Sequence, residues 1–363
     1  METDRSTREI RALETRWQVR LPDAFSRLYG AFEYPFISPC EFLPLDSLLS
    51  DGDRWRGMLP QFLPFGDDGD ENYFGFYVPS TAVGSDFPVL MWDHEYDHYF
   101  PIASNFDSFL RWCVIYGRYL AQDSFEEEEA GGEGEDAQRL EFAELLSLPP
   151  ELVRDAIPRN ERELNERILR ADGQNAWAIS QLGGHFFRQG KIERARDYFV
   201  RASEAAPWFA DPYYLLAETY RLSGDEARAC RLWWHVFESP IAFSTRTSNY
   251  NLGDSHPETE VYEAAANRCV ECRSQLEESS TASPLWRLLQ EGDPFSPGPR
   301  FALAEELKAA GDAAGREREL LNALTLATDS RDIARAYEEL IALYERIGRT
   351  RDATLCRRDA ALD

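Results

Sequence analysis

Two aspartate–histidine pairs, Asp93-His94 and Asp97-His98, carry side chains that could bind a metal ion. An acidic run at residues 67–71 (Asp-Asp-Gly-Asp-Glu) supplies the oxygen ligands that calcium prefers. However, the run lacks the ligand spacing and the distal glutamate of an EF-hand loop. The histidines are expected where a strand ends, and a four-residue spacing there does not place two ligands on one face. We therefore expect surface histidines, no metal site and no cofactor.

Cysteine chemistry is the second possibility. Cys269 and Cys272 form a C-x-x-C motif inside a helical pattern, and no second C-x-x-C or histidine pair completes a zinc site. We expect one face of this helix to bury both thiols. The scattered cysteines predict no disulfide framework and suit a reducing compartment. The chain contains six of them: Cys40, Cys113, Cys230, Cys269, Cys272 and Cys356.

Short sequence motifs of enzymes are missing. The chain contains no G-x-S-x-G, P-loop, G-x-G-x-x-G or H-E-x-x-H. The acidic composition leaves a paired-carboxylate hydrolase open, but nothing in the sequence singles out a pair. We expect a protein that acts by binding and not by catalysis.

The charge is strongly negative and unevenly distributed. The 363 residues include 65 acidic and 39 basic side chains, a net charge of −26. Residues 1–40 hold six of each sign, whereas residues 41–110 hold thirteen acidic and two basic residues, a net −11. Such a balance repels nucleic-acid phosphates and favours a basic protein partner. We therefore expect a protein as partner and no binding of nucleic acid.

Carboxylates and aromatic rings occur together in this acidic part of the chain. At an interface, aromatic side chains act as anchors and carboxylates steer a basic partner. For each residue the alternative interpretation is a solvated loop carboxylate or a core ring. The candidate partner-binding residues are Asp67, Asp68, Asp70, Glu71, Asp93, Glu95, Asp97, Tyr96 and Tyr99.

The elements before residue 123 are mixed helix and strand. Apolar residues at helical spacing predict two helices near the N terminus and one near residue 110, and runs of strand formers bounded by turn residues lie between them. The expected elements cover residues 6–18, 23–32, 62–65, 73–79, 88–94 and 105–122. We predict an α+β domain over residues 1–123, a sheet with flanking helices, followed by an acidic Gly/Glu linker over 124–138.

Residues 139–363 are expected to be all-α, with an internal repeat. A pattern of large and small apolar residues at 179–207 recurs thirty-four residues further on, and a weaker pair follows at 303–360. This matches the tetratricopeptide pattern of two antiparallel helices per repeat. The turns between the paired helices are expected at glycines that tolerate a left-handed backbone: Gly190, Gly224, Gly311 and Gly348.

Other segments complete this repeat domain. Residues 239–259 break the helical rhythm and predict an inserted loop, while 140–157 and 161–173 are expected to cap the array. Stacked helix pairs form a groove that binds peptides and helices. Aromatic residues outside the expected core frame are the candidates for that groove: Trp208, Tyr214 and Trp234.

Three blocks of the first domain resemble the SUKH superfamily. Residues 13–32 give a helix, a Leu-Pro joint and a second helix, and residues 63–78 give a strand, an acidic turn and a strand. Residues 88–114 give a strand that ends in Trp-Asp-His and leads into the last helix. Where the family usually continues with Asn-Gly, this chain has Phe-Glu-Tyr-Pro at 32–35, which affects the local turn and not the fold.

The resemblance implies a protein-binding module, since many bacterial members resemble immunity proteins that neutralise a toxin, often a nuclease. The leading hypothesis is an immunity-type protein whose acidic face binds a basic, nuclease-like toxin, with the repeats as a second interaction surface or a homodimer contact. The alternative is a regulatory adaptor or scaffold whose repeats recruit a client. No apolar run is long enough to span a bilayer, and residues 1–10 do not form a secretory signal, so we expect a soluble, cytoplasmic protein that binds no membrane.

Overall fold

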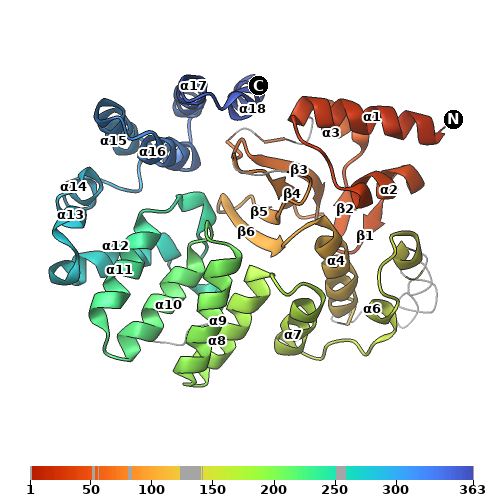
Figure 1. The fold of residues 1–363 in the computed structure, drawn as a ribbon, viewed down its shortest axis with the longest axis horizontal. Coiled ribbons are helices and arrows are strands. Elements are labelled where there is room, and N and C mark those ends of the chain that lie inside the picture. Colours follow the sequence, from red (N-terminus) through yellow and green to blue (C-terminus); the bar gives the residue numbers. More distant parts are fainter. Residues whose placement is uncertain are drawn as a thin grey trace. The chain divides into compact units, whose positions relative to one another are not determined.

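The computed structural model describes residues 2–50, 54–55, 57–80, 84–122, 140, 142–250 and 259–362 (Figure 1). The predicted linker at 124–138 lies outside these residues. The chain divides into two compact units, which we call the sheet unit and the helical unit. The sheet unit comprises 1–54, 63–94 and 101–179, and the helical unit comprises 55–62, 95–100 and 180–363. Two short pieces of the N-terminal region therefore belong to the helical unit.

A six-stranded antiparallel sheet in the order β1-β2-β3-β4-β5-β6 organises the N-terminal region. Each strand pairs with the next one in sequence. Short turns connect the first strand to the second, the third to the fourth and the fifth to the sixth, whereas the connections over residues 43–61 and 78–88 are longer. The register places Phe36 opposite Glu41, Glu41 opposite Asp67, and Tyr73 opposite Trp92. The strands are β1 (Phe36–Ile37), β2 (Cys40–Phe42), β3 (Phe62–Asp67), β4 (Tyr73–Tyr77), β5 (Val89–Asp93) and β6 (His98–Ala103).

Phenylalanine rings join one face of this sheet to two helices, α2 (Asp23–Ala31) and α4 (Phe106–Leu120). The ring of Phe65 on β3 lies 5.4 Å from that of Phe106 and 4.7 Å from that of Phe76 on β4, and Phe25 of α2 packs 5.4 Å from Phe106. Asn105 caps α4 by accepting a hydrogen bond from the Ser108 amide at 2.9 Å. Burial of one such ring stabilises the fold by roughly 2 kcal/mol. This confirms the predicted α+β class, with the sheet and its flanking helices in the expected order.

Further helices complete the sheet unit. Figure 1 shows α1 (Glu2–Trp17) and α3 (Leu45–Ser50) near the N terminus, and α6 (Glu151–Arg154) and α7 (Glu161–Ala171) beside α4. Both oxygens of the Asp172 carboxylate bind Ser104, accepting from its amide at 2.9 Å and its hydroxyl at 2.7 Å. The sequence placed residues 140–173 at the start of the repeat array, whereas in the structure α6 and α7 pack on α4.

The helical unit consists mainly of consecutive helices that pack as pairs. In four pairs the turn between the helices contains a glycine with a left-handed backbone, and these are the predicted positions 190, 224, 311 and 348. The all-α class is confirmed, while the tetratricopeptide assignment stays a prediction. The pairs are α8 (Ala176–Arg188) with α9 (Ile192–Ala205), α10 (Asp211–Leu222) with α11 (Glu226–Phe237), α15 (Pro297–Ala310) with α16 (Ala313–Leu326), and α17 (Ser330–Arg346) with α18 (Thr350–Ala360).

Shorter elements connect these pairs. They are η1 (Ile241–Phe243), η2 (Thr247–Tyr250), α12 (Val261–Glu271), η3 (Arg273–Gln275), α13 (Glu278–Thr281) and α14 (Pro284–Glu291). The hydroxyl of Tyr337 donates to the carbonyl of Met58 at 3.0 Å, and the Gln61 amide donates to the Tyr344 hydroxyl at 3.1 Å. These hydrogen bonds attach residues 55–62 to the helices of the helical unit. No helix among the described residues is long and apolar enough to cross a membrane.

The described part of the predicted inserted loop is held by one buried carboxylate. Asp211 accepts hydrogen bonds from the Thr245 amide at 2.9 Å, from the Thr245 hydroxyl and from the Tyr250 hydroxyl at 2.8 Å. Burial raises the pKa of Asp211 to about 6, although these three donors favour its charged form. The loop is thereby tied to the start of α10; residues 251–258 lie outside the described part.

A disulfide bond corrects the expectation for the cysteines. Cys230 of α11 is bonded to Cys272 at the end of α12, across 42 residues of sequence. Cys272 is therefore not a free buried thiol of the C-x-x-C helix, whereas Cys269 is buried and free as expected. The sequence spacing gave no sign of this pairing, because the packing of two helices brings the cysteines together. The bond joins the second helix pair to the helix that follows the inserted loop.

Peptide mapping under non-reducing conditions tests this bond. We expect proteolysis of the alkylated, unreduced protein to yield one linked pair of peptides that contain Cys230 and Cys272. The variant Cys272→Ser should lose this species, and Cys269→Ser should keep it, because Cys269 is a separate buried thiol. Recovery of all six cysteines in alkylated form, without reduction, would contradict the assignment.

An ion pair in the helical unit is completely buried. The guanidinium of Arg300 donates to the Glu319 carboxylate at 2.6 Å, to the Tyr262 hydroxyl at 2.6 Å and to the Pro294 carbonyl at 2.9 Å. Neither charged side chain is exposed. Because each nitrogen of the guanidinium has an acceptor and one of these is a carboxylate, the charges are compensated inside the protein.

Removing one partner should therefore be costly. We expect Glu319→Ala to lower the free energy of unfolding by about 3–5 kcal/mol, since it leaves the Arg300 charge buried and unpaired. The exposed pair Arg287–Glu306 is the matched control, and Glu306→Ala should cost at most about 1 kcal/mol. Urea denaturation of the full chain measures both values, and equal losses would show that burial does not decide the difference.

Candidate protein-binding surface

The hairpin of β1 and β2 presents a row of side chains away from the phenylalanine core. Cys40 and Phe42 are buried, so alternation along β2 turns Glu41 to the opposite side, where it is exposed. Residues directly opposite each other in an antiparallel pair share one face of the sheet. Phe36 and Asp67 therefore lie on the same side as Glu41. We call these three residues the edge row, because β1 is the last strand at one end of the sheet order.

The turn between β3 and β4, which we call the acidic turn (residues 67–71), follows directly from this row. Its first two carboxylates hold the backbone of the turn. Asp67 accepts from the Gly69 amide at 2.9 Å, and Asp68 accepts from the Asp70 amide at 2.9 Å and from the Asn72 amide at 3.2 Å. The Asn72 side chain also donates to Asp68, at 2.9 Å. Side chains of aspartate commonly stabilise tight turns in this way.

A second set of bonds ties the acidic turn to the end of β5. The side-chain oxygen of Asn72 accepts from the His94 amide at 3.3 Å and lies 3.1 Å from its Nδ1. The Nε2 of His94 is 3.9 Å from the Glu71 carboxylate. The Asp70 and Glu71 side chains themselves are exposed. The turn therefore presents two carboxylates to solvent on a backbone that the other polar groups hold.

The remaining candidates of this stretch divide between the two units. Asp93 ends β5 in the sheet unit, whereas Glu95, Tyr96, Asp97 and Tyr99 belong to the helical unit. Glu95 is exposed and Asp97 is half-buried. Tyr96 is 41% exposed, and the guanidinium of Arg246 lies 4.9 Å from its ring centre.

Tyr99 is a core residue, and its assignment to a binding face is wrong. The side chain is 2% exposed, its hydroxyl accepts from the Leu59 amide at 2.8 Å, and its ring packs 5.0 Å from that of Phe62. His98 is also buried and lies 3.0 Å from the Glu260 carboxylate, so it is not the surface histidine expected. No group of three or more His, Cys, Asp or Glu side chains is placed to hold a metal ion in the described part of the chain.

Two of the three groove candidates are also core residues. Tyr214 and Trp234 are buried, and Trp234 packs 5.8 Å from Trp286. Trp208 is half-buried against Phe243. The error for Tyr214 comes from the frame along α10, where Tyr213 is the more exposed member of the pair.

The sequence interpretation missed two exposed aromatics, one in the edge row and one two residues before it. Tyr34 is 70% exposed and Phe36 is 59% exposed. Buried and exposed residues alternate on both sides of the turn at Ser38-Pro39, but Phe36 and Ile37 are both apolar, so the sequence does not show this alternation. The strands of this hairpin are only two and three residues long, and such short runs are weak indicators of a strand.

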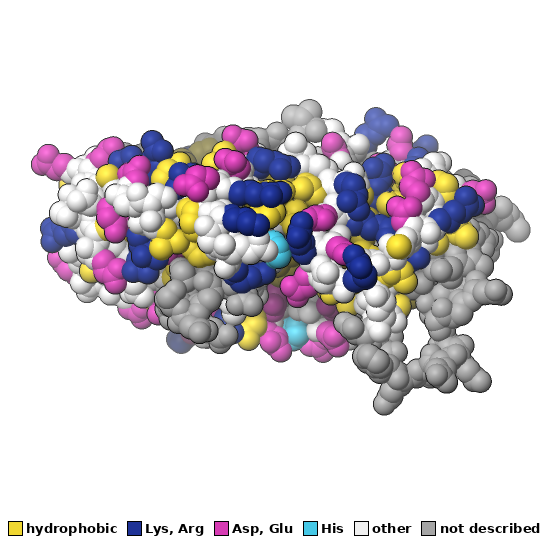
Figure 2. Space-filling view, turned by 90° about the horizontal axis from the view of Figure 1, so that it is seen from below, with side chains coloured by type: hydrophobic (Ala, Val, Ile, Leu, Met, Phe, Trp, Pro, Cys, Tyr) yellow, Lys and Arg dark blue, Asp and Glu magenta, His cyan; other side chains and the backbone are white. Residues whose placement is uncertain are grey.

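Positive side chains gather on other parts of the surface. Figure 2 shows Lys and Arg side chains grouped on the face that it draws. In the helical unit, Arg194 lies 3.9 Å from the ring centre of Phe186 and Arg196 lies 4.5 Å from that of Tyr220. The net charge of −26 therefore does not mean that every part of the surface is negative. Within residues 63–94 the sequence contains six acidic residues and no Lys or Arg, so this segment is acidic on its own.

The bonds of the acidic turn predict different roles for its carboxylates. We expect Asp68→Ala to lower the free energy of unfolding by about 1–3 kcal/mol, because three donors lose their acceptor. Asp70→Ala should change it by at most about 0.5 kcal/mol, because that side chain is exposed. Urea denaturation gives the energies, and amide exchange at Asn72 should accelerate in the Asp68 variant alone. Equal effects of the two substitutions would contradict these roles.

Comparison with known proteins bears on the part of the chain that carries this surface. No curated protein matches the chain. The model of the SMI1 / KNR4 family (SUKH-1) matches residues 6–112. The match includes all six strands, the acidic turn and the start of α4, and it confirms the resemblance seen in the sequence. Residues 6–112 thus form a domain of the SMI1 / KNR4 family (SUKH-1).

Proposed function

We propose that the protein is an immunity-type binding protein whose SUKH-1 domain neutralises a basic, nuclease-like toxin. The SUKH family is consistent with such a protein-binding function. The surface that would bind the toxin comprises the edge row and the acidic turn. In this role the chain acts by occupying its partner and performs no catalysis of its own. The proposal places the protein in the cytoplasm, where a nuclease toxin reaches its substrate.

The observation that carries the proposal is that the carboxylates of the acidic turn have two different roles. Asp67 and Asp68 hold the turn by accepting backbone hydrogen bonds. The side chains of Asp70 and Glu71 are exposed on this turn. A pre-organised charge loses little conformational entropy when a partner binds. An exposed aromatic ring, Phe36, lies in the adjoining edge row and could anchor the contact.

Electrostatics explain why a nuclease suits this surface. A nuclease needs a cationic surface to hold phosphate groups, and carboxylates placed against that surface compete with the substrate. Opposite charges across an interface also raise the rate of association, and salt screens this effect. The expected complex therefore forms fast at low ionic strength and weakens as salt increases.

The helical unit is proposed as a second protein-interaction surface. The adaptor function that the sequence left open has no specific support from the groove candidates, because Tyr214 and Trp234 are core residues. Trp208 is half-buried and remains a candidate contact.

Affinity purification of the tagged full-length protein from its native host tests the toxin proposal. We expect one basic protein to be retained at low salt and reduced at high salt, as identified by mass spectrometry. The double variant Asp70→Asn, Glu71→Gln should retain about five- to thirtyfold less of it at low salt, since two charge pairs are lost.

The control is a double variant of two exposed glutamates elsewhere in the sheet unit, Glu144→Gln with Glu161→Gln, which has the same net charge. It should retain the partner as the wild type does. Equal losses in both variants would indicate a general charge effect. Recovery of housekeeping proteins regardless of salt would replace the toxin proposal with the adaptor function.

A further inference from the structure

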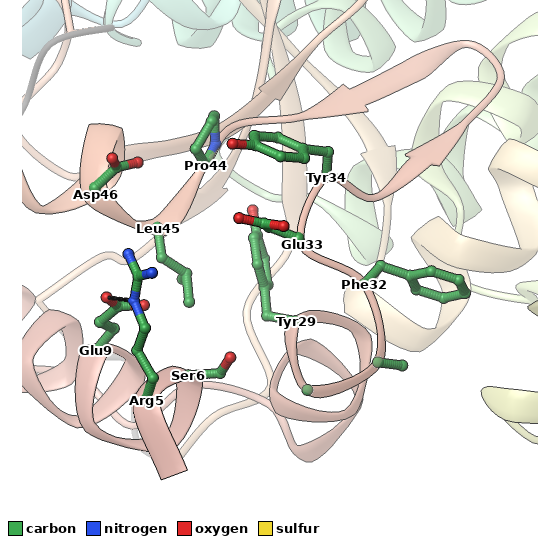
Figure 3. Close-up of a pocket in the computed structure, with 12 residues that line it drawn as sticks. Arg5, Ser6, Glu9, Tyr29, Phe32, Glu33, Tyr34, Pro44, Leu45 and Asp46 are labelled. Atoms are coloured by element: carbon green, nitrogen blue, oxygen red, sulfur yellow. Dashed lines mark hydrogen bonds and ion pairs between the residues drawn. The ribbon is translucent and has the colours of Figure 1, made fainter. Parts of the chain in front are cut away.

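A cavity of about 350 Å³ lies in the sheet unit, between α1, the end of α2 and the start of α3. Figure 3 shows that Glu33, Tyr34 and Pro44 lie on one side and Arg5 and Glu9 on the other. The acidic turn contributes no residue to it. The lining residues are Arg5, Ser6, Glu9, Tyr29, Gly30, Ala31, Phe32, Glu33, Tyr34, Pro44, Leu45 and Asp46.

The apolar part of the cavity is formed by residues that differ in exposure. Tyr29 is buried, and its hydroxyl donates to the Leu43 carbonyl at 2.6 Å, so its ring is fixed. Leu45 is buried beside it. Tyr34 is 70% exposed, so its ring is accessible to an occupant. The cavity therefore has one rigid aromatic wall and one exposed aromatic ring.

Three carboxylates surround this cavity, and they differ in how they are paired. Glu9 accepts from the Arg5 guanidinium at 2.8 Å. Asp46 accepts from the neighbouring Ser47 amide at 3.0 Å. Among the described residues, neither Glu33 nor Asp46 forms an ion pair. Three negative charges against one positive charge leave the cavity with a net charge of −2.

All three carboxylates stabilise the positive charge of the Arg5 guanidinium. The hydrogen bond and charge of Glu9 raise the pKa of the Arg5 guanidinium, and the charges of Glu33 and Asp46 act in the same direction. The three carboxylates thus act together on a guanidinium. However, the Arg5 side chain is 66% exposed, and its ion pair within the described part of the chain is with Glu9, one helical turn away. Exposed pairs of this kind are weak, so another cation can compete for the remaining carboxylates.

We propose that this cavity binds the side chain of an arginine that a protein partner presents. The guanidinium would lie between Glu33 and Asp46, and its flat face would stack on Tyr34. A guanidinium suits this arrangement better than an ammonium, because it is planar, stacks on aromatic rings and donates to two carboxylates at once. Arg5 acts as an internal competitor that partly neutralises the cavity until the partner arrives. The proposal does not rest on the toxin function, and the cavity shares no residue with the edge row or the acidic turn.

Capped amino acids test the cavity directly. The full-length ¹⁵N-labelled protein is titrated at low salt with N-acetyl-arginine-N′-methylamide and with the lysine and citrulline analogues. We expect saturable shifts of the Gly30 and Ala31 amides with the arginine compound, at millimolar concentrations, and weaker shifts with lysine. Citrulline has the same shape as arginine without its charge, and it should cause no shifts. Equal shifts with citrulline would overturn the proposal.

Variants assign the roles of the carboxylates and of Arg5. Glu33→Gln with Asp46→Asn should weaken arginine binding at least about fivefold, and Arg5→Gln should tighten it about twofold. All three residues are exposed, so the thermal unfolding of the variants should match that of the wild type. Glu144→Gln is the matched control and should leave binding unchanged. Unchanged binding in the double variant, or weaker binding after Arg5→Gln, would refute the proposal.

A last comparison separates a protein partner from a small cation. The peptide Gly-Gly-Arg-Gly-Gly and free agmatine carry the same guanidinium. If the site serves a protein partner, the peptide should bind at least as tightly as agmatine, because its backbone does not obstruct the exposed side at Tyr34. Tighter binding of agmatine, with no shifts from the peptide, would assign the cavity to a small-molecule cation instead.

Discussion

The packing of phenylalanine rings between the sheet and helices α2 and α4 is the constraint on which the sheet unit depends. The rings of Phe42, Phe65 and Phe76 must face this core. The residues on the opposite side of the hairpin are therefore exposed to solvent. A shift of register by one residue would turn Glu41 into the core, at a cost of several kcal/mol. The same contact that stabilises the fold therefore also determines which carboxylates and aromatics are exposed.

The hydrogen bonds of a carboxylate, and not its position in an acidic segment, decide whether it is available to a partner. Asp68 in the acidic turn and Asp211 in the helical unit accept three hydrogen bonds each, and Glu319 neutralises a buried guanidinium. Breaking such bonds to bind a partner would cost more than a new surface ion pair returns. Glu71 and Glu33 are exposed, and within the described part of the chain Glu71 has one long ion pair and Glu33 has none. A partner can bind such carboxylates at little cost.

Much of the fold was predictable from residue patterns, because those patterns reflect local physical constraints. The helical spacing around residue 110, the cap at Asn105 and the glycines at 190 and 224 each act within a few residues of sequence. The hairpin at 36–42 was missed because its strands are too short to give a periodic signal. The disulfide and the burial of Tyr99 depend on segments distant in sequence, which no local pattern can indicate.

The candidate surface was only partly predictable, because its hydrogen bonds also leave no local pattern in the sequence. Composition located the acidic stretch, and it could not distinguish Asp68, which holds the turn, from Glu71, which faces solvent. That distinction requires knowing where the backbone amides point. Asp68 accepts from the amides of Asp70 and Asn72, in a turn where Gly69 and Glu71 have left-handed backbones. The cavity beside Arg5 is a stronger case, since its carboxylates come from three elements that are helical or irregular and share no motif. Electrostatic sites of this kind arise from the fold, and the net charge of a chain indicates neither their place nor their strength.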